Sequence, residues 1–280
     1  MTPGAVTGHP FSTLEFFMRV EELEIIGSDG ATVTVFEKRL SSREHGEAEA
    51  HTRLRAEADL LSVLGGRVTP TLVGAGEDHR GPWLRTERIA FPTLAKRLDA
   101  AVEAGRDVLE AAWVERAVRA AFAALAELHG ASDARGALQI VHADLSPANV
   151  AVDDAGDRAF VLDLELASWR GAATRDGAFR GTVAYCAPEV ARGEPPTVAS
   201  DLYALAAAFV HVATGIAPRR GPSLAALLAV AAERPILDAL PVPRTELEAR
   251  GAAHAALVRC LAHLPYERPA SAREVLCLCV

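Results

Sequence analysis

The stretch Ile140-Val-His-Ala-Asp-Leu-Ser-Pro-Ala-Asn-Val-Ala-Val152, together with Phe160-Val-Leu-Asp-Leu-Glu165, carries the strongest signal in the chain. It holds Asp144, Asn149 and Asp163 in order, five and then fourteen residues apart. Apolar runs flank these polar residues, which predicts short strands and tight turns around them. An Asp that can accept a proton, followed by an Asn and an Asp that can bind divalent metal, is typical of phosphoryl transfer from a nucleotide.

The spacing of the last two residues predicts a β-hairpin. Val150–Val152 and Phe160–Leu162 are apolar, and Asp153-Asp-Ala-Gly-Asp157 between them has the composition of a turn. Pairing of the two strands would fold Asp163 back beside Asn149.

The segment His142-Ala-Asp-Leu-Ser-Pro-Ala-Asn149 resembles the catalytic loop of the protein kinase superfamily. The resemblance implies that Asp144 orients the substrate hydroxyl and accepts its proton. It also implies that Asn149 and Asp163 ligate Mg²⁺, a hard ion that prefers oxygen donors, and that ATP is the nucleotide. An isolated His-x-Asp could instead be a helix cap or a turn, but Asn149 and Asp163 weigh against that alternative.

Two later segments also resemble the superfamily. Gly181-Thr-Val-Ala-Tyr-Cys-Ala-Pro-Glu189 is similar to the end of an activation segment, and Pro265-Tyr-Glu-Arg-Pro-Ala-Ser271 to the late Arg-Pro motif. The resemblance implies a structural ion pair between Glu189 and Arg268. Small-molecule phosphotransferases share the catalytic-loop pattern but generally lack the first of these segments.

Asp201-Leu-Tyr-Ala-Leu-Ala206 resembles the start of the long buried helix that anchors the catalytic loop. The resemblance implies that Asp201 accepts hydrogen bonds from the backbone of that loop. The alternative is a helix N-cap formed by Ser200 or Asp201.

Val35-Phe-Glu-Lys38, at the end of a predicted strand, resembles the kinase strand that ends in a phosphate-binding lysine. The resemblance implies that Lys38 contacts the α- and β-phosphates and pairs with a Glu on the next helix. Glu57 is the expected partner. Glu47 and Glu49 are alternatives, but they lie near the helix start, where they would compensate the helix dipole.

Trp83-Leu-Arg-Thr-Glu-Arg-Ile-Ala-Phe-Pro-Thr-Leu94 resembles the strand and hinge that bind adenine through backbone groups. The resemblance implies that Glu87 and Ile89 supply those groups, with Thr86 in the gatekeeper position. Thr93 is expected to cap a following helix.

An intact G-x-G-x-x-G is missing from the sequence. Gly8-His-Pro-Phe-Ser-Thr-Leu14 loosely resembles a Gly-rich phosphate loop, with Gly8 at its start and Phe11 at its tip. Gly27-Ser-Asp-Gly30 lies too close to Lys38 and is better explained as a hairpin turn.

Three residues near the catalytic set depart from the usual kinase pattern. Ala143 stands where many kinases have the Arg that docks a phosphorylated activation segment, which predicts activity without such a phosphate. Ser146 replaces a Lys that touches the γ-phosphate, and Glu165 adds a carboxylate beside the metal site. Asp-x-Glu with His-x-Asp-Leu-Ser-Pro is loosely similar to the kinase domains of lanthipeptide synthetases.

Composition limits the partners and the location of the chain. A net charge of −8 over 280 residues argues against nucleic acid as a partner. The longest apolar runs are too short for a membrane-spanning helix, and the first residues lack the pattern of a signal peptide. We therefore expect a cytoplasmic protein that binds no membrane, and the sequence leaves its oligomeric state open.

Periodicity predicts an α+β fold in two lobes. Strands are expected at 13–20, 23–26, 31–36, 71–73 and 83–89, with a helix at 46–64 and a loop at 76–81. After Pro92 the pattern is mainly helical. We expect a bilobal protein-kinase-like fold with a nucleotide-binding N-terminal lobe (1–90) and a C-terminal lobe (91–280).

The resemblance as a whole implies an atypical bacterial eukaryotic-like protein Ser/Thr kinase. The reaction would be ATP-dependent phosphoryl transfer to a Ser or Thr hydroxyl of a protein or peptide. Two alternatives stay open: a small-molecule phosphotransferase of the aminoglycoside or choline kinase type, and a pseudokinase that senses nucleotide as a scaffold.

Overall fold

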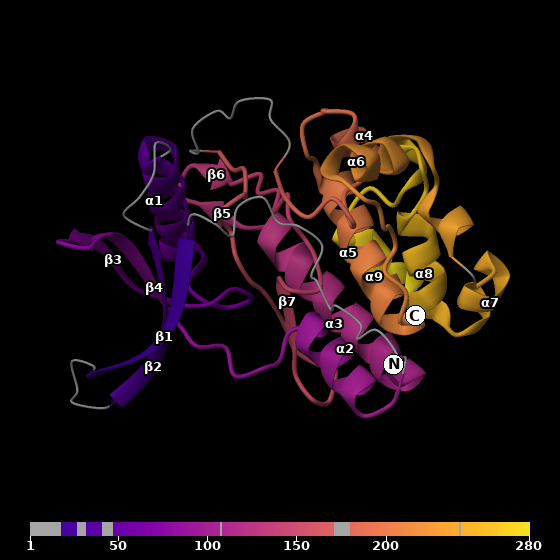
Figure 1. Ribbon diagram of the computed structural model, residues 1–280, viewed down its shortest axis with the longest axis horizontal. Coiled ribbons are helices and arrows are strands. Elements are labelled where there is room, and N and C mark those ends of the chain that lie inside the picture. Colours follow the sequence, from indigo (N-terminus) through magenta and orange to yellow (C-terminus); the bar gives the residue numbers. More distant parts are fainter. Residues whose placement is uncertain (1–17, 27–31, 41–46, 107, 171–179, 241) are drawn as a thin grey trace, which may run out of the picture.

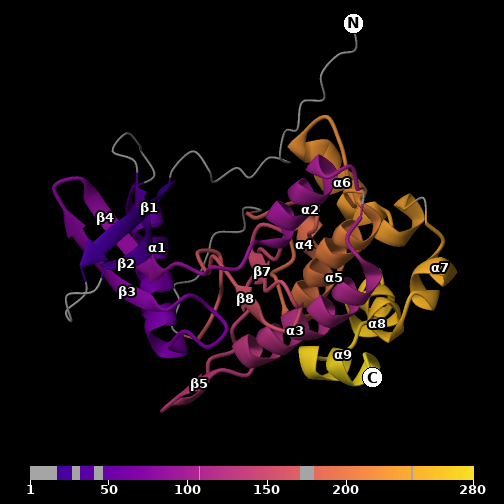
Figure 2. The ribbon, with the colours of Figure 1, turned by 90° about the horizontal axis from the view of Figure 1, so that it is seen from below.

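The chain forms two lobes, one built around a β-sheet and one made mainly of helices (Figure 1 and Figure 2). The sheet and α1 (Glu47–Leu64) lie at one end in both views, and the remaining helices lie at the other. The predicted α+β bilobal kinase-like fold is confirmed. The computed structural model describes residues 18–26, 32–40, 47–106, 108–170, 180–240 and 242–280.

The described part of the sheet lobe contains antiparallel strands in the order β1-β2-β4-β3. The helix α1 packs on this sheet and buries Leu54, Leu60 and Leu61 against it. The helix predicted at 46–64 is thus correct. The strands are β1 (Met18–Ile26), β2 (Thr32–Leu40), β3 (Leu72–Asp78) and β4 (Gly81–Glu87).

Two predictions of strand boundaries at the start of the sheet are wrong. The strands expected at 13–20 and 23–26 are one continuous strand over the described residues from Met18, because Glu21 and Glu22 stay paired with β2 instead of forming a turn. The strand expected at 31–36 continues past Lys38 to Leu40. Residues 13–17 lie outside the described part of the chain.

The loop predicted at 76–81 is also much shorter. Strand β3 continues to Asp78 and β4 begins at Gly81. Arg39 on the neighbouring strand donates to Asp78 Oδ1 over 2.7 Å and to the Gly81 carbonyl over 3.0 Å, which holds the two strand ends together. The strand predicted at 83–89 ends at Glu87.

Beyond Pro92 the described chain is mainly helical, as predicted. Thr93 caps α2 by accepting a hydrogen bond from the Lys96 amide over 3.2 Å. The predicted lobe boundary at residue 90 lies between β4 and α2 and stays a prediction. The helices are α2 (Leu94–Glu103), α3 (Ala111–His129), α4 (Pro188–Ala191), α5 (Val198–Thr214), α6 (Leu224–Glu233), α7 (Arg244–Ala249), α8 (Ala252–Cys260) and α9 (Ala272–Leu278), with 3₁₀ turns at Ile236–Ala239 and Pro265–Glu267.

Helix α5 forms the centre of the helical lobe and is buried along almost all of its length. It is apolar on all sides, which is typical of a fully buried helix. The alternative in which Ser200 or Asp201 is the N-cap is not found. The helix begins one turn earlier, and Thr197 is the N-cap in a capping box with Ser200. The carboxylate of Asp201 is therefore available for another role.

The predicted hairpin after the catalytic loop is present as β7 (Val150–Val152) and β8 (Ala159–Val161). The Leu162 amide donates to the Asn149 carbonyl over 2.9 Å, just beyond the paired strands. This bond returns the chain to Asn149 immediately before Asp163. A short two-stranded ladder, β5 (Ser132–Asp133) and β6 (Gly136–Ala137), precedes the loop.

The Glu189–Arg268 pair expected from the sequence is present inside the helical lobe. Arg268 Nη1 and Nη2 donate to the two carboxylate oxygens of Glu189 over 2.6 Å and 2.8 Å. Both side chains are buried, and the guanidinium also lies over the ring of Tyr203 on α5. The pair joins two segments about eighty residues apart in sequence.

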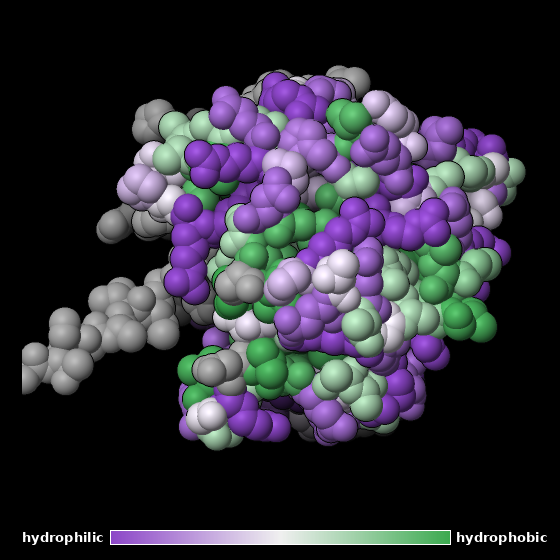
Figure 3. All heavy atoms as spheres, turned by 90° about the vertical axis from the view of Figure 1, so that its right-hand side faces the viewer, coloured by the Kyte–Doolittle hydropathy of each residue, from purple (hydrophilic) through white to green (hydrophobic). Residues whose placement is uncertain are grey.

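On the face that the helical lobe turns away from the sheet, hydrophilic residues cover most of the surface, and apolar residues form smaller groups among them (Figure 3). None of the helices in the described ranges is long and apolar enough to cross a membrane.

Candidate active site

Lys38 on β2 lies at the centre of the candidate site. Its Nζ donates to both carboxylate oxygens of Glu57 over 2.9 Å and to Asp163 Oδ1 over 2.6 Å. Glu57 belongs to α1 and Asp163 follows β8, so one ammonium group joins three separate segments. Side chains alternate between the two faces of a strand, and the alternation along β2 turns Lys38 to the opposite face from the buried Glu37.

Asp144 sits in a loop that hydrogen bonds hold from two sides. Its Oδ1 accepts from the Thr182 amide over 2.8 Å, and its Oδ2 accepts from Asn149 Nδ2 over 3.2 Å. The same Asn149 amide group donates to the Asp144 carbonyl over 2.8 Å. The carboxylate is thus oriented by Asn149 of the catalytic loop and by the backbone of Thr182, the residue after Gly181.

Gly181 makes the hydrogen bond from the Thr182 amide possible. Its φ of +112° lies in a region that side-chain-bearing residues avoid, and a Cβ built there would lie 3.1 Å from Asp144 Oδ1. The absence of a side chain lets the backbone approach the carboxylate closely enough for the Thr182 amide to donate to it.

The Asp201 carboxylate, at the start of α5, holds the backbone of the catalytic loop. Its carboxylate accepts from the amides of His142 and Ala143 over 2.7 Å and 2.9 Å, and it lies 2.9 Å from His129 Nε2. Ala143 has a φ of +67°, an uncommon conformation for a residue with a side chain. These bonds hold the loop in that conformation, in agreement with the role that the resemblance implies for Asp201.

The segment from Asp163 to Glu165 is attached to α1 as well as to Lys38. The Leu164 amide donates to Glu57 Oε1 over 3.1 Å, and Asp163 itself has a φ of +59°. Glu165 pairs with a residue of α1. Its carboxylate lies 3.4 Å from Arg53 Nε on α1, an interaction that the sequence did not predict.

A metal at this site would be held by Asn149 and Asp163. Because the Asn149 Nδ2 group donates to Asp144, its Oδ1 is the atom oriented for a metal. Within the described residues, no group of three or more His, Cys, Asp and Glu side chains forms a metal cage. One carboxylate and one amide oxygen fit Mg²⁺, which proteins bind through one or two carboxylates with phosphate oxygens and water.

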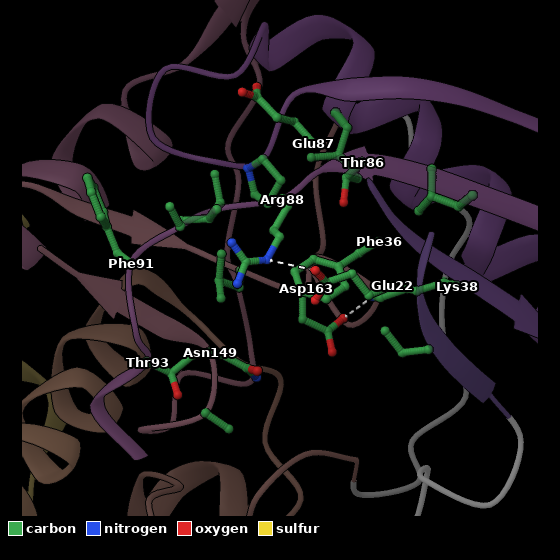
Figure 4. A pocket seen from close by; sticks show the side chains of 18 of the residues that line it. Glu22, Phe36, Lys38, Thr86, Glu87, Arg88, Phe91, Thr93, Asn149 and Asp163 are labelled. Carbon is green, nitrogen blue, oxygen red and sulfur yellow. Dashed lines mark hydrogen bonds and ion pairs between the residues drawn. The ribbon is translucent and has the colours of Figure 1, made fainter. Parts of the chain in front are cut away.

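A pocket of about 460 Å³ opens beside these residues, between the two lobes (Figure 4). Thr86 and Glu87 line it from β4, Ile89 from the segment that follows, and Asn149 and Asp163 from the helical lobe. The Glu87 amide already donates to the Thr71 carbonyl over 2.9 Å, so its own carbonyl is the group that could meet a base.

The pocket also contains residues that the sequence analysis missed. Phe36 lines its roof two residues before Lys38, and Arg88 lies 3.2 Å from Glu22 across its mouth (Figure 4). Phe36 could have been found from the two-residue alternation of β2, because it shares a face with Lys38. The Arg88–Glu22 pair joins residues far apart in the sequence and gives no local signal.

The other residues named from the sequence differ in whether they lie at the pocket. Gly8 and Phe11 lie outside the described residues. Ser146 is buried and does not line the pocket in the described chain, whereas Lys96 on α2 does. Glu49 pairs with Arg180 and not with Lys38, which leaves Glu57 as the partner of the lysine.

The charges at the site oppose one another. Burial lowers the pKa of Lys38, but the carboxylates of Asp163, Glu57 and Glu165 raise it and prevail, so the amine stays charged. Burial also raises the pKa of Asp163, and Lys38 outweighs it and holds that pKa low. Burial and then the charge of Asp163 raise the pKa of Asp144 to about 6.

Residues 28–277 match the family described as protein kinase domain. The chain belongs to the protein kinase family. Among relatives, this kinase is 32% identical over 209 residues to the serine/threonine-protein kinase PknL of Mycobacterium tuberculosis. The matched region covers 74% of the chain and 48% of PknL. The kinase is 31% identical over 194 residues to the serine/threonine-protein kinase AfsK of Streptomyces griseus, covering 68% of the chain and 22% of AfsK.

A third relative, the serine/threonine-protein kinase PknK of Mycobacterium bovis, is 35% identical over 153 residues, which is 53% of the kinase and 13% of PknK. The chain therefore spans about half the length of PknL and a smaller part of the other two. The predicted similarity to bacterial Ser/Thr kinases is confirmed. The looser similarity to lanthipeptide synthetases and the atypical character stay predictions.

Proposed function

We propose that this kinase transfers the γ-phosphoryl group of ATP to a Ser or Thr hydroxyl of a protein or peptide. The observation that carries the proposal is the bridge from Lys38 to Glu57 and Asp163 at the inner end of the pocket. A charged amine and a metal-binding carboxylate at one place provide what a polyphosphate needs, because positioning and charge neutralisation supply most of the catalysis.

Each predicted site residue has a role in this proposal. Lys38 binds the α- and β-phosphates and Glu57 orients it. The backbones of Glu87 and Ile89 receive the adenine, while Gly8 and Phe11 belong to the loop proposed to cover the phosphates. Mg²⁺ on Asn149 and Asp163 would neutralise the charge that develops on the phosphates.

Asp144 acts as the base in the transfer step. The acceptor hydroxyl donates its proton to the carboxylate while its oxygen forms the new bond to phosphorus and the bond to the leaving ADP breaks. Hydrogen bonds from Thr182 and Asn149 hold the carboxylate in place for this step.

The two alternatives predict different results. A small-molecule phosphotransferase is disfavoured by the segment from Gly181 to Glu189 and by Arg268, since these belong to protein kinases. A pseudokinase would bind nucleotide without transferring phosphate. No nucleic acid or membrane is required in any of the three functions.

The test of the proposal is labelled ATP with Mg²⁺ and the purified chain, offered Ser/Thr peptides, aminoglycosides and amino alcohols. We expect label on the chain itself or on peptides, and its loss in Asp163→Ala, because that variant lacks the metal-binding carboxylate. Asp154→Ala is the matched control, since that aspartate is almost fully exposed and pairs only with Arg97 at the surface among the described contacts. Label on the small molecules alone, or none on any acceptor, would contradict the proposal.

The pH profile provides a second check. The base must be ionised, so kcat/KM should fall about tenfold per pH unit below about pH 6, the pKa of Asp144, and level off above it. The direction follows because acid protonates the carboxylate that accepts the substrate proton. Steady-state rates between about pH 5 and 8 measure this, and a rate that rises as the pH falls would exclude Asp144 as the base.

A further inference from the structure

Three charged residues of α1 lie four residues apart on one helix face: Glu49, Arg53 and Glu57. We call them the α1 stripe. Each contacts a different segment beside the active site. Glu57 binds Lys38 and the Leu164 amide, while the other two reach segments that the catalytic mechanism does not use directly.

Arg53, in the middle of the α1 stripe, faces the residue that departs from the usual kinase pattern. Its Nε lies 3.4 Å from Glu165 Oε1, and its Nη1 lies 3.9 Å from Glu49 Oε1. The side chains of Arg53 and Glu165 are only 13% and 10% exposed. Neither Nε nor Nη1 makes a hydrogen bond among the described residues, so Arg53 is held by opposite charge rather than by aligned bonds.

Glu49 extends the α1 stripe to the end of the activation segment. It forms an ion pair with Arg180, the residue before Gly181. Two residues further on, the Thr182 amide donates to Asp144. The α1 stripe thus connects the helix to the segment that aims the catalytic carboxylate.

We propose that Arg53, together with Glu49 and Glu165, is a positioning residue that docks α1 on the catalytic segments in place of a phosphorylated activation segment. This inference rests on the proposed function. Ala143 has no side-chain charge with which to dock such a phosphate, whereas Glu165 and Glu49 are carboxylates that the chain always carries. Their ion pairs need no modifying enzyme, so the kinase is competent as synthesised.

Charge explains why the docking depends on Arg53. Without its guanidinium, the buried Glu165 would face the carboxylates of Asp163 and Glu57 with Lys38 as the shared cation. Without the guanidinium, the ion pair that joins α1 to the segment from Asp163 to Glu165 is lost. Helix α1 and the segment from Asp163 to Glu165 would then move apart. The contact between Lys38 and Glu57 would be disturbed as well.

The experiment compares Arg53→Met, Glu165→Gln and the double variant after treatment with a phosphatase. We expect each single change to lower kcat at least about tenfold, with the KM for ATP within about threefold, because neither residue lines the nucleotide pocket in the described chain. The double variant should be no worse than the more damaged single one, since the two residues act through one contact. Wild-type kinase should keep its rate after the phosphatase treatment.

Arg55→Met is the matched control. Arg55 lies two residues away on α1, is 72% exposed and meets Glu77 at 3.6 Å on another side of the helix. Its rate should stay within about twofold of wild type. Equal rates for Arg53→Met and Arg55→Met, multiplied losses in the double variant, or an inactive phosphatase-treated wild type would each overturn the inference.

Hydrogen exchange in α1 separates this inference from the proposed function and from simple unfolding. Arg53→Met and Glu165→Gln should speed amide exchange in 47–64 more than in 198–214, the central helix of the other lobe. If the wild type transfers no phosphate, only the proposed function is contradicted. The hydrogen exchange rates in α1 still test the docking role of the α1 stripe. Unchanged exchange in both variants would overturn the docking role.

Discussion

Asp144→Asn should lower kcat of the kinase by about 10²- to 10⁴-fold, the usual contribution of a positioned base. The asparagine keeps the size of the side chain and an oxygen that can accept from Thr182, but it cannot take the substrate proton. Its amide also replaces the acceptor that meets Asn149 Nδ2 at 3.2 Å. Steady-state turnover with a peptide acceptor measures the loss.

The control for this change is Asp154→Asn, in the turn of the β7–β8 hairpin, where the side chain is exposed and pairs with Arg97. We expect its turnover to match wild type. Nucleotide affinity should be nearly unchanged in Asp144→Asn, because the pocket lining does not include Asp144 in the described chain. If turnover survives in Asp144→Asn, another residue is the base.

Arg268→Met should destabilise the fold by about 3–5 kcal/mol, because it leaves the carboxylate of Glu189 buried without its partner. The variant also loses the guanidinium that lies over Tyr203 on the central helix. Chemical denaturation, with the midpoint and the slope both fitted, measures the change in the free energy of unfolding.

Two variants test whether the buried pair is the cause. Arg192→Met removes an exposed arginine that pairs with Glu194 at 3.2 Å, and we expect a loss below about 1 kcal/mol. Adding Glu189→Gln to Arg268→Met should recover part of the lost stability, since it removes the unpaired charge. Equal losses for Arg268→Met and Arg192→Met would show that the buried pair contributes little.

The sequence predicted the parts of the site that are encoded locally. The hairpin β7–β8 follows from two apolar triplets around a turn, and it returns the chain to Asn149 before Asp163. The helix 46–64 follows from its leucine spacing. These features depend on residues close together in the chain, where periodicity and turn composition carry the information.

The features that the sequence did not predict depend on contacts between distant segments. Arg39 closes the ends of β3 and β4 from another strand, so the turn there is shorter than its composition suggests. Arg53 forms an ion pair with Glu165, which lies over a hundred residues away in the sequence. The role of Asp201 was open because a carboxylate near a helix start has the same local pattern as a cap. The start of α5 at Val198 and the hydrogen bonds from the His142 and Ala143 amides separate the two roles.

The close approach at Gly181 has a consequence for the evolution of this kinase. A φ of +112° and a Cβ position 3.1 Å from Asp144 Oδ1 disfavour every other residue type for two unrelated reasons. Even alanine, the smallest change, would strain the backbone and press against Asp144. We therefore expect substitutions at this position to be selected against, although the residue has no side chain and takes no part in the chemistry.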